Sequence, residues 1–257
     1  MDNVVVLNFF QFALIYLLLL IVLAIMKLSK AGQSKQIILA SMTMTVQLIL
    51  AGLILSYIFK NPNPVFVAVY VAAMIAFSIW RVLSKNKGLN KRFKIAVAVS
   101  IAFSGLFVVV YFVGIVVGIS LFNPQYVIPI SGMVFGNTMT GVGLALKTFD
   151  ESLKSQRLKM DVLLNLGAAP KKILRPFANN ALETALLPTI NSMFGMGIVS
   201  LPGMMTGQIL AGTDPFVAIL YQIAIMISIC TAVCLSVYLC LEMGYRTLYN
   251  KKGQFEF

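Results

Sequence analysis

The sequence predicts an all-α integral membrane protein with seven transmembrane helices, an N-terminus outside the cell and a C-terminus in the cytoplasm. Three observations lead to this fold class. The 257 residues are 60% hydrophobic and only 11% charged, and the mean hydropathy is +0.93. The apolar residues form runs long enough to cross a membrane, and the basic residues gather between alternate runs. A soluble domain of this size does not have this balance.

Each predicted span is an apolar run, because a helix that crosses the hydrocarbon core needs roughly 20 apolar residues. The predicted spans are Val4–Met26, Ile37–Phe59, Pro64–Leu83, Ile95–Phe122, Gln125–Leu146, Glu183–Leu210 and Pro215–Met243. The first span follows no basic segment and is followed by lysines, so it is expected to be an uncleaved anchor. Asp214 followed by Pro215 predicts an N-cap and the first residue of the last helix.

The positive charges predict the orientation of the spans. Of the 20 Lys and Arg residues, all except Lys60 lie at or after the ends of the first, third, fifth and seventh spans. Cytoplasmic loops carry an excess of Lys and Arg, so these segments are expected inside. The net charge of +12 is therefore an orientation signal, and no nucleic-acid partner is expected.

One long polar stretch, from about Lys147 to Asn180, interrupts the apolar pattern. Thr148-Phe149-Asp150-Glu151 fits a capping box, so a new helix is expected to begin just after the fifth span. The apolar residues Phe149, Leu153, Met160 and Leu164 then recur near helical spacing, with basic residues on the other side. We expect an amphipathic cytosolic helix that lies along a partner or, alternatively, along anionic lipid.

Several classes of chemistry are excluded by the residues that the sequence lacks. There is no histidine, which removes histidine proton relays and nucleophile pairs. Gly136 to Gly141 has the glycines of a phosphate-binding loop, but Val142 stands where the lysine is required. The chain is therefore not expected to hydrolyse ATP or to be an enzyme. Cys230, Cys234 and Cys240 lack the spacing of a zinc or disulfide motif.

Neutral polar residues inside the spans are the candidates for a translocation path. Amides and hydroxyls in hydrocarbon need partners or water, although interhelical hydrogen bonding is the commoner role of any single one. The candidates are Gln47, Asn137, Thr138, Asn191, Thr206 and Gln208. Glu183 and Glu242 are expected at the cytoplasmic edges of their spans, so no carboxylate is expected inside the membrane.

Spans five and six are also rich in glycine and contain Pro129, Pro188 and Pro202, so they are expected to be bent or broken. A helix break at Pro202-Gly203 would free backbone carbonyls to line a path, as in many transporters. Among the 14 methionines, Met204 and Met205 are candidates for metal ligands, and apolar packing is the commoner use of such residues.

The segment Asp161-Val162-Leu163-Leu164-Asn165-Leu166-Gly167-Ala168-Ala169-Pro170 resembles the cytoplasmic coupling loop of ABC-transporter permeases. In that loop an acidic residue precedes a glycine by six positions, and Gly-Ala-x-Pro opens a short helix. This sequence departs from the common form by an aspartate in place of glutamate and by Val162-Leu163 in place of two alanines. The resemblance implies a coupling helix at Leu166–Lys172 that docks on an ATPase. The coupling residues would be Asp161, Leu166, Gly167, Ala168 and Pro170.

The segment from Pro188 to Gly212, with Ser200-Leu201-Pro202-Gly203-Met204-Met205-Thr206-Gly207 inside it, is similar to the FetB-type iron-export permeases, a group that includes plant aluminium-resistance permeases. Ile128-Pro129-Ile130-Ser131-Gly132-Met133 and Val46-Gln47-Leu48 fit the same family. The resemblance implies a single transmembrane permease domain over residues 1–257, with a cytoplasmic coupling region at about residues 147–182.

The same resemblance implies the partners and the function. The chain is expected to be a multi-pass permease of the plasma or inner membrane, to form a homodimer, and to work with a separate cytosolic ABC ATPase that binds ATP and magnesium. No cofactor is expected on this chain itself. The expected function is ATP-driven export of iron or another metal ion. Two alternatives stay open, namely an ABC permease for a different solute, and a non-transporting membrane scaffold or stand-alone carrier.

Overall fold

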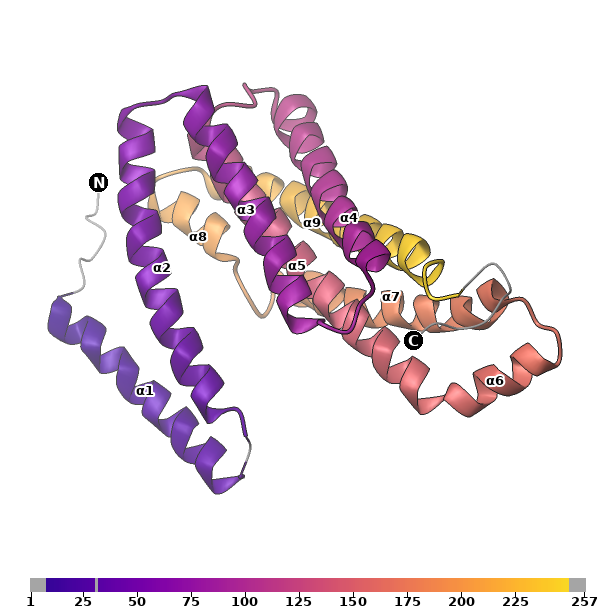
Figure 1. Ribbon diagram of the computed structural model, residues 1–257. Coiled ribbons are helices and arrows are strands. Elements are labelled where there is room, and N and C mark those ends of the chain that lie inside the picture. The colour runs from indigo at the N-terminus through magenta and orange to yellow at the C-terminus, as the bar shows by residue number, and fades with distance from the viewer. Residues whose placement is uncertain (1–7, 31, 250–257) are drawn as a thin grey trace. The chain divides into compact units, whose positions relative to one another are not determined.

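Figure 1 shows a computed structural model of the protein, which describes residues 8–30 and 32–249. The chain divides into two compact units, Met1–Asn61 and Pro62–Phe257, and each is described by itself. The elements of the first unit are α1 (Phe9–Leu28) and α2 (Ser34–Lys60). Those of the second are α3 (Pro64–Lys85), α4 (Lys91–Tyr111), the π-helical segment η1 (Phe112–Val117), α5 (Pro124–Ser155), α6 (Arg157–Asn165), α7 (Pro170–Gly195), α8 (Gly203–Leu210) and α9 (Pro215–Tyr245).

Among the described residues, six helices are long and apolar enough to cross a membrane: α1, α2, α3, α4 with η1, α5 and α9. They correspond to six of the seven predicted spans, and the predicted start of the first span, Val4, lies outside the described residues. The remaining predicted span, Glu183–Leu210, is not one helix. The helix α7 ends at Gly195 and α8 begins at Gly203. The number of crossings and their orientation therefore stay predictions, as does the single permease domain.

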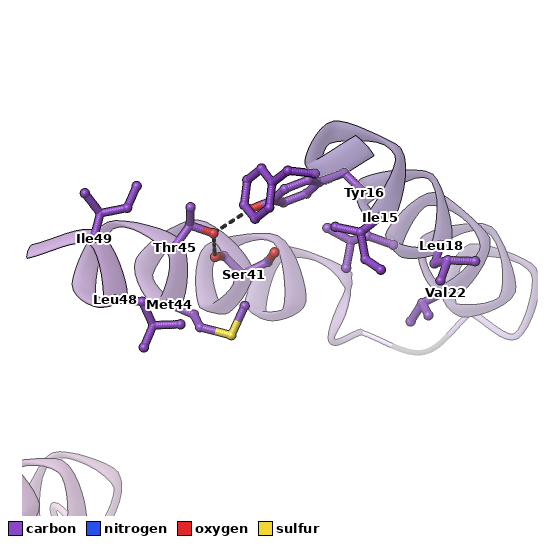
Figure 2. Close-up of a pocket in the computed structure, with 11 residues that line it drawn as sticks. Ile15, Tyr16, Leu18, Val22, Ser41, Met44, Thr45, Leu48 and Ile49 are labelled. Carbon is purple, nitrogen blue, oxygen red and sulfur yellow. Dashed lines mark hydrogen bonds between the residues drawn. The ribbon is translucent and has the colours of Figure 1, made fainter. Parts of the chain in front are cut away.

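The first unit is a hairpin of two apolar helices, joined by a hydrogen bond between Tyr16 on α1 and Thr45 on α2 (Figure 2). The Thr45 hydroxyl donates its proton to the carbonyl oxygen of Ser41, so the Tyr16 hydroxyl is the donor to Thr45 Oγ1, at 2.5 Å. Around this pair lies a groove of about 560 Å³ with an apolar lining. Since the lining is almost entirely apolar, the groove offers little to a polar ligand.

The second unit is built around α4, α5 and α9, which pack against one another in pairs. Each pair of helices meets at a glycine, where a side chain of the neighbouring helix occupies the space of the missing Cβ. The three contacts are Gly105 with Phe135, Gly141 with Val233, and Gly244 with Phe93. Small residues permit this close approach of helices in membranes. By contrast, the G-x-x-x-G pair of α8, Gly203 and Gly207, has nothing within 4 Å of a Cβ position.

The helix α5 continues well past the predicted end of the fifth span. Its 32 residues extend about 48 Å at 1.5 Å per residue, whereas the hydrocarbon core is about 30 Å thick. The expectation that a new helix begins at Thr148 is wrong, because the buried stripe that includes Leu146, Phe149 and Leu153 continues without interruption. Pro129 lies inside the same helix, which is not broken there.

The helix α7 lies antiparallel to α9 over most of its length. Near the start of α7, Lys171 Nζ lies 3.8 Å from Glu242 Oε1, near the end of α9. Beyond the end of α7, Met196 Sδ accepts a hydrogen bond from Gln222 Nε2 at 3.7 Å, near the start of α9. The two contacts are separated by 20 residues of α9, which is about 30 Å of helix. Pro176 and Pro188 lie inside α7, which continues through both.

Candidate functional site

The polar stretch of the sequence forms an elbow in which α6 joins the projecting end of α5 to the start of α7. Figure 1 shows α6 as an arm at one end of the second unit, with α7 returning from it towards α9. The end of α6 is closed by two backbone hydrogen bonds, from Gly167 to Leu164 at 2.9 Å and from Ala168 to Leu163 at 3.0 Å. These are the bonds of a Schellman motif, which needs a left-handed residue, and Gly167 has φ +83°.

The predicted coupling helix Leu166–Lys172 is therefore a turn followed by the first residues of a long helix. Leu166 caps α6, Gly167 and Ala168 form the turn, and Pro170 is the first residue of α7. One helix ends and the next begins here for a local reason. Glycine just after a helix is a strong end signal, and proline at the first position of a helix is a strong start signal. Asp161 lies on α6, about one and a half helical turns before Gly167, and its side chain is exposed.

The two faces of α6 are both apolar, and each has a different environment. On one face of α6 Met160 is buried and Leu164 is half-buried, and the predicted stripe begins on α5, where Phe149 and Leu153 are buried. The other face carries Leu158, Val162 and Leu166, which are 84%, 58% and 77% exposed. We call these three residues the α6 ridge. Their spacing of four residues was the available signal in the sequence, and the prediction overlooked it.

Basic residues surround this ridge, and the Glu242 carboxylate links the start of α7 to the end of α9. Lys154, Arg157, Lys159, Lys171, Lys172 and Arg175 are all exposed around α6 and at the start of α7. Glu242 accepts hydrogen bonds from Tyr245 and Arg246 on its own helix and lies beside Lys171 of α7. Hydrogen bonding to this carboxylate and its negative charge raise the pKa of the Arg246 guanidinium. The start of α7 is thus tied to the end of α9.

The predicted path residues of α5 point in different directions. Asn137 is exposed and its Nδ2 donates to the carbonyl oxygen of Met133 at 2.8 Å. Thr138, the next residue, is fully buried in the bundle, and its hydroxyl oxygen has no hydrogen-bond partner. Successive helical residues are rotated by about 100°, so these two side chains do not line one surface. Thr140 lies on the same side as Asn137, and its hydroxyl donates to Gly136.

Most of the remaining candidates lie on α8 or at its start. Pro202 is the N-cap of α8 and accepts a hydrogen bond from the Thr206 hydroxyl at 3.1 Å through its carbonyl oxygen. Gly203 is the first residue of α8, and Gln208 is half-buried on it. Asn191 is exposed on α7. Gln47 is exposed on α2, in the first unit.

Gln222 on α9, a polar residue of the seventh predicted span, is not among the predicted path residues. Its side chain is 5% exposed, its Nε2 bonds to Met196 at the α7–α8 break, and its Oε1 has no partner. A glutamine inside an apolar helix was the available signal.

The methionine candidates differ in burial, and the described residues contain no cluster of acidic, cysteine or histidine ligands. Met205 is 8% exposed and Met204 is half-buried, on different sides of α8. No group of three or more His, Cys, Asp or Glu side chains that could hold a metal ion occurs within residues 8–30 and 32–249. A metal site on this chain would therefore need neutral donors, or carboxylates contributed by more than one copy.

The expected position of Glu183 at the cytoplasmic edge of a span stays a prediction. Interpolation between the Lys171–Glu242 and Met196–Gln222 contacts places Glu183 level with about Ala232, near the middle of α9. Its side chain is exposed, and no other described residue pairs with its carboxylate. The predicted start of the sixth span, Glu183, is not the start of a helix, because α7 begins 13 residues earlier, at Pro170.

Comparisons with known proteins find relatives that are named as membrane proteins. The sequence pattern described as "Uncharacterised protein family (UPF0014)" matches residues 9–249. The chain is 31% identical over 250 residues to UPF0014 membrane protein YjkA of Bacillus subtilis (strain 168), covering 96% of this chain and 98% of that protein. It is 31% identical over 242 residues to Probable iron export permease protein FetB of Escherichia coli (strain K12), covering 94% and 92%.

A plant relative, Protein ALUMINUM SENSITIVE 3 of Arabidopsis thaliana, is 30% identical over 181 residues, covering 70% of this chain and 65% of that protein. No solved structure matches the chain. The apolar helices and the membrane proteins that it resembles make this a multi-pass membrane protein. With a match over nearly its whole length, the chain belongs to the UPF0014 family of membrane proteins, and one of its relatives is named as a probable permease.

Proposed function

We propose that this chain is the membrane subunit of an ATP-driven transporter that exports iron or another metal ion, and that a separate ABC ATPase docks on the α5–α6–α7 elbow. The observation that carries the proposal is the α6 ridge. Leu158, Val162 and Leu166 are largely exposed at the end of a projecting helix. Exposed apolar residues rimmed by charge are typical of protein-binding surfaces. The relative FetB is named a probable iron export permease, and this name supports iron or another metal ion as the proposed cargo.

The proposal includes the topology. The helix α7 is not apolar enough to be counted as a span by composition, but it lies beside α9 over about 30 Å of that helix. With α7 and α8 counted as one broken crossing, the chain makes seven crossings. The N-terminus is then outside, and the elbow and C-terminus are inside, as the basic residues favour. The ATPase would bind ATP and magnesium, and two copies of this chain would form the transporter.

The broken crossing gives the proposed transport cycle a mechanical basis. Closure of the ATPase would push on the elbow, and the Lys171–Glu242 pair and the continuous α7 would carry the displacement towards Met196 and Gln222. Irregular backbone at membrane depth is tolerated where it lines a cavity or is buried in protein. Movement of α7 and α8 against α9 would then open the path to alternate sides.

Co-purification with the ATPase tests this proposal. The ATPase to test would be a chain without spans that carries a Walker A motif and is encoded next to this one. Tagged wild-type permease should retain it on a column, and Leu158→Asp with Leu166→Asp should release it. The matched surface control is Lys87→Asp, on the loop between α3 and α4. A substitution such as Ile95→Asp is not a suitable control, because Ile95 lies in a span. An ATPase that never co-purifies with the wild-type chain would contradict the proposal.

A further inference from the structure

The groove of the first unit lies between two helices that bury very little of their surface. None of the described residues of α1 is buried, and Ile58 is the one buried residue of α2. Both helices contribute side chains to the lining (Figure 2). The groove volume of about 560 Å³ lies within the usual range of small-molecule sites, about 300–1,000 Å³. Because the lining is apolar and both helices are long enough to cross a membrane, the ligand chemistry that fits is a hydrocarbon chain.

The groove has the length and the depth of one leaflet of a bilayer. It begins at Val22 and Ser41, which are each seven residues, or about 10 Å, from the turn that joins α1 to α2. From Val22 it extends along α1 to Phe12, about 15 Å away. Half of the hydrocarbon core is also about 15 Å thick, and the headgroup region adds about 5–8 Å on each side. A lipid chain in the groove therefore has its headgroup beside the turn.

The turn carries the charge that a negative headgroup requires. Lys27, Lys30 and Lys35 lie at the end of α1, in the turn and at the start of α2, and all three are exposed. We call them the turn lysines. No aspartate or glutamate occurs among the described residues of the first unit, so no carboxylate of that unit neutralises them. The other end of the hairpin has a single lysine among the described residues, Lys60.

We propose that this groove holds an acyl chain of a phospholipid with a negatively charged headgroup, and that the turn lysines bind the headgroup. The hydrogen bond between Tyr16 and Thr45 joins the two helices within the groove, so a bound chain contacts both of them. In the proposed topology the turn is cytoplasmic, on the side where anionic lipids give a membrane its negative surface potential. The inference goes beyond the proposed function, because it involves neither the cargo nor the ATPase.

Quenching of tryptophan fluorescence by brominated phospholipids tests this site. Trp80 is the only tryptophan of the chain, so Leu18→Trp in a Trp80→Phe background places one reporter in the lining of the groove. The full-length protein is reconstituted in phosphatidylcholine vesicles that contain the same small fraction of brominated phosphatidylglycerol or brominated phosphatidylcholine. Brominated phosphatidylglycerol should quench this reporter more strongly. Phe107→Trp, on the exposed apolar surface of α4, is the control reporter and should be quenched equally by the two lipids.

Removal of the turn lysines tests the headgroup contact. A lysine beside an anionic lipid surface contributes about fivefold in affinity, so replacing all three turn lysines by glutamine should abolish the preference for phosphatidylglycerol at the groove reporter. Lys85→Gln, Lys87→Gln and Lys91→Gln together are the matched control, at exposed positions around the loop between α3 and α4, and should leave the preference unchanged. Equal quenching of Leu18→Trp by the two lipids, or a preference that survives loss of the turn lysines, would overturn the proposal.

A variant with a filled groove distinguishes this site from a basic surface without a groove. Ser41→Phe adds a large side chain at the end of the groove nearest the turn and keeps the turn lysines. It should lower the phosphatidylglycerol preference at Leu18→Trp, whereas Thr43→Phe, at an exposed position of α2 outside the lining, should not. Full preference in Ser41→Phe would show that the lysines attract the lipid without the groove. A groove reporter that neither lipid quenches would show that protein fills the groove, and either result would overturn the proposal.

Discussion

Gly141 of α5 lies directly against Val233 of α9, so that a Cβ atom at position 141 would be only 2.5 Å from Val233 Cγ1. This contact sets how closely the two helices approach and fixes their register. The packing of α5 against α9 therefore depends on this pair of residues.

We predict that Gly141→Ala destabilises the protein by about 1–3 kcal/mol, the usual cost of forcing extra volume into a packed interior. Thermal unfolding in detergent measures this loss. Gly143→Ala is the matched control on the same helix, since nothing lies within 4 Å of its Cβ position. Adding Val233→Ala to Gly141→Ala should restore part of the stability by removing the clashing methyl groups. A Gly141→Ala protein as stable as Gly143→Ala would show that the helices are farther apart.

The turn of the elbow gives a second prediction, at Gly167. Its φ of +83° is unfavourable for residues with a Cβ, by about 1–2 kcal/mol. Gly167→Ala should therefore weaken the elbow more than Gly167→Asn, because asparagine tolerates the left-handed region better. Hydrogen exchange of the Gly167 and Ala168 amides, or of their replacements, reports the loss of the α6 cap. Equal protection in the two variants would argue against the left-handed turn.

Gly167→Glu should uncouple ATP hydrolysis from transport. The substitution places a long charged side chain beside Leu166 of the α6 ridge, where the ATPase is proposed to dock. ATP hydrolysis by the reconstituted transporter should lose its dependence on cargo, and transport should fall to background. Gly88→Glu, on another loop with open space around it, is the control. Normal transport by Gly167→Glu would contradict the docking assignment.

The sequence predicted the spans and the start of the last helix better than it predicted the elbow. Long apolar runs identified six spans, and Asp214 caps α9 through Phe216 and Val217 as predicted. The end of α5 was misjudged because a four-residue capping signal at Thr148 was outweighed by a buried stripe that continues through it. A short local motif does not decide a helix boundary when tertiary packing continues across it.

The candidate site was less predictable than the fold, for reasons of direction and register. Asn137 and Thr138 are adjacent in sequence, but one is exposed and the other is buried. The depth of Glu183 follows only from contacts at both ends of α7. The sequence analysis placed the start of a span at Glu183, because its charge follows a polar stretch and precedes an apolar one. Which side chains share a surface depends on helix rotation and register, which a list of polar residues does not contain.

A fourth prediction concerns Gln222, whose buried Oε1 has no hydrogen-bond partner. An unsatisfied buried acceptor costs about 1–3 kcal/mol, whereas an apolar group of similar shape avoids this cost. Gln222→Leu should therefore unfold at no lower temperature than the wild type, although it loses the bond to Met196. Gln222→Ala, which leaves a cavity, should be less stable than Gln222→Leu. A markedly destabilised Gln222→Leu would mean that the amide has partners that it lacks in this structure.

The Lys171–Glu242 pair should matter little for stability and more for coupling. Both side chains are partly exposed, at 52% and 25%, and such pairs contribute about 0–1 kcal/mol. Lys171→Glu should leave the unfolding temperature nearly unchanged but reduce transport per ATP hydrolysed, because the start of α7 is released from α9. Adding Glu242→Lys should recover part of the coupling. A large stability loss with unchanged coupling would make the pair purely structural.

The central claim is that this chain moves a metal ion with energy from an ATPase bound at the elbow. Inside-out vesicles that contain the permease and its ATPase test it most directly, with radioactive Fe²⁺ supplied outside and ATP as the only variable. We predict that Fe²⁺ accumulates inside the vesicles only with hydrolysable ATP, and that Leu158→Asp with Leu166→Asp abolishes the accumulation. Equal Fe²⁺ content with and without ATP in wild-type vesicles would contradict the claim.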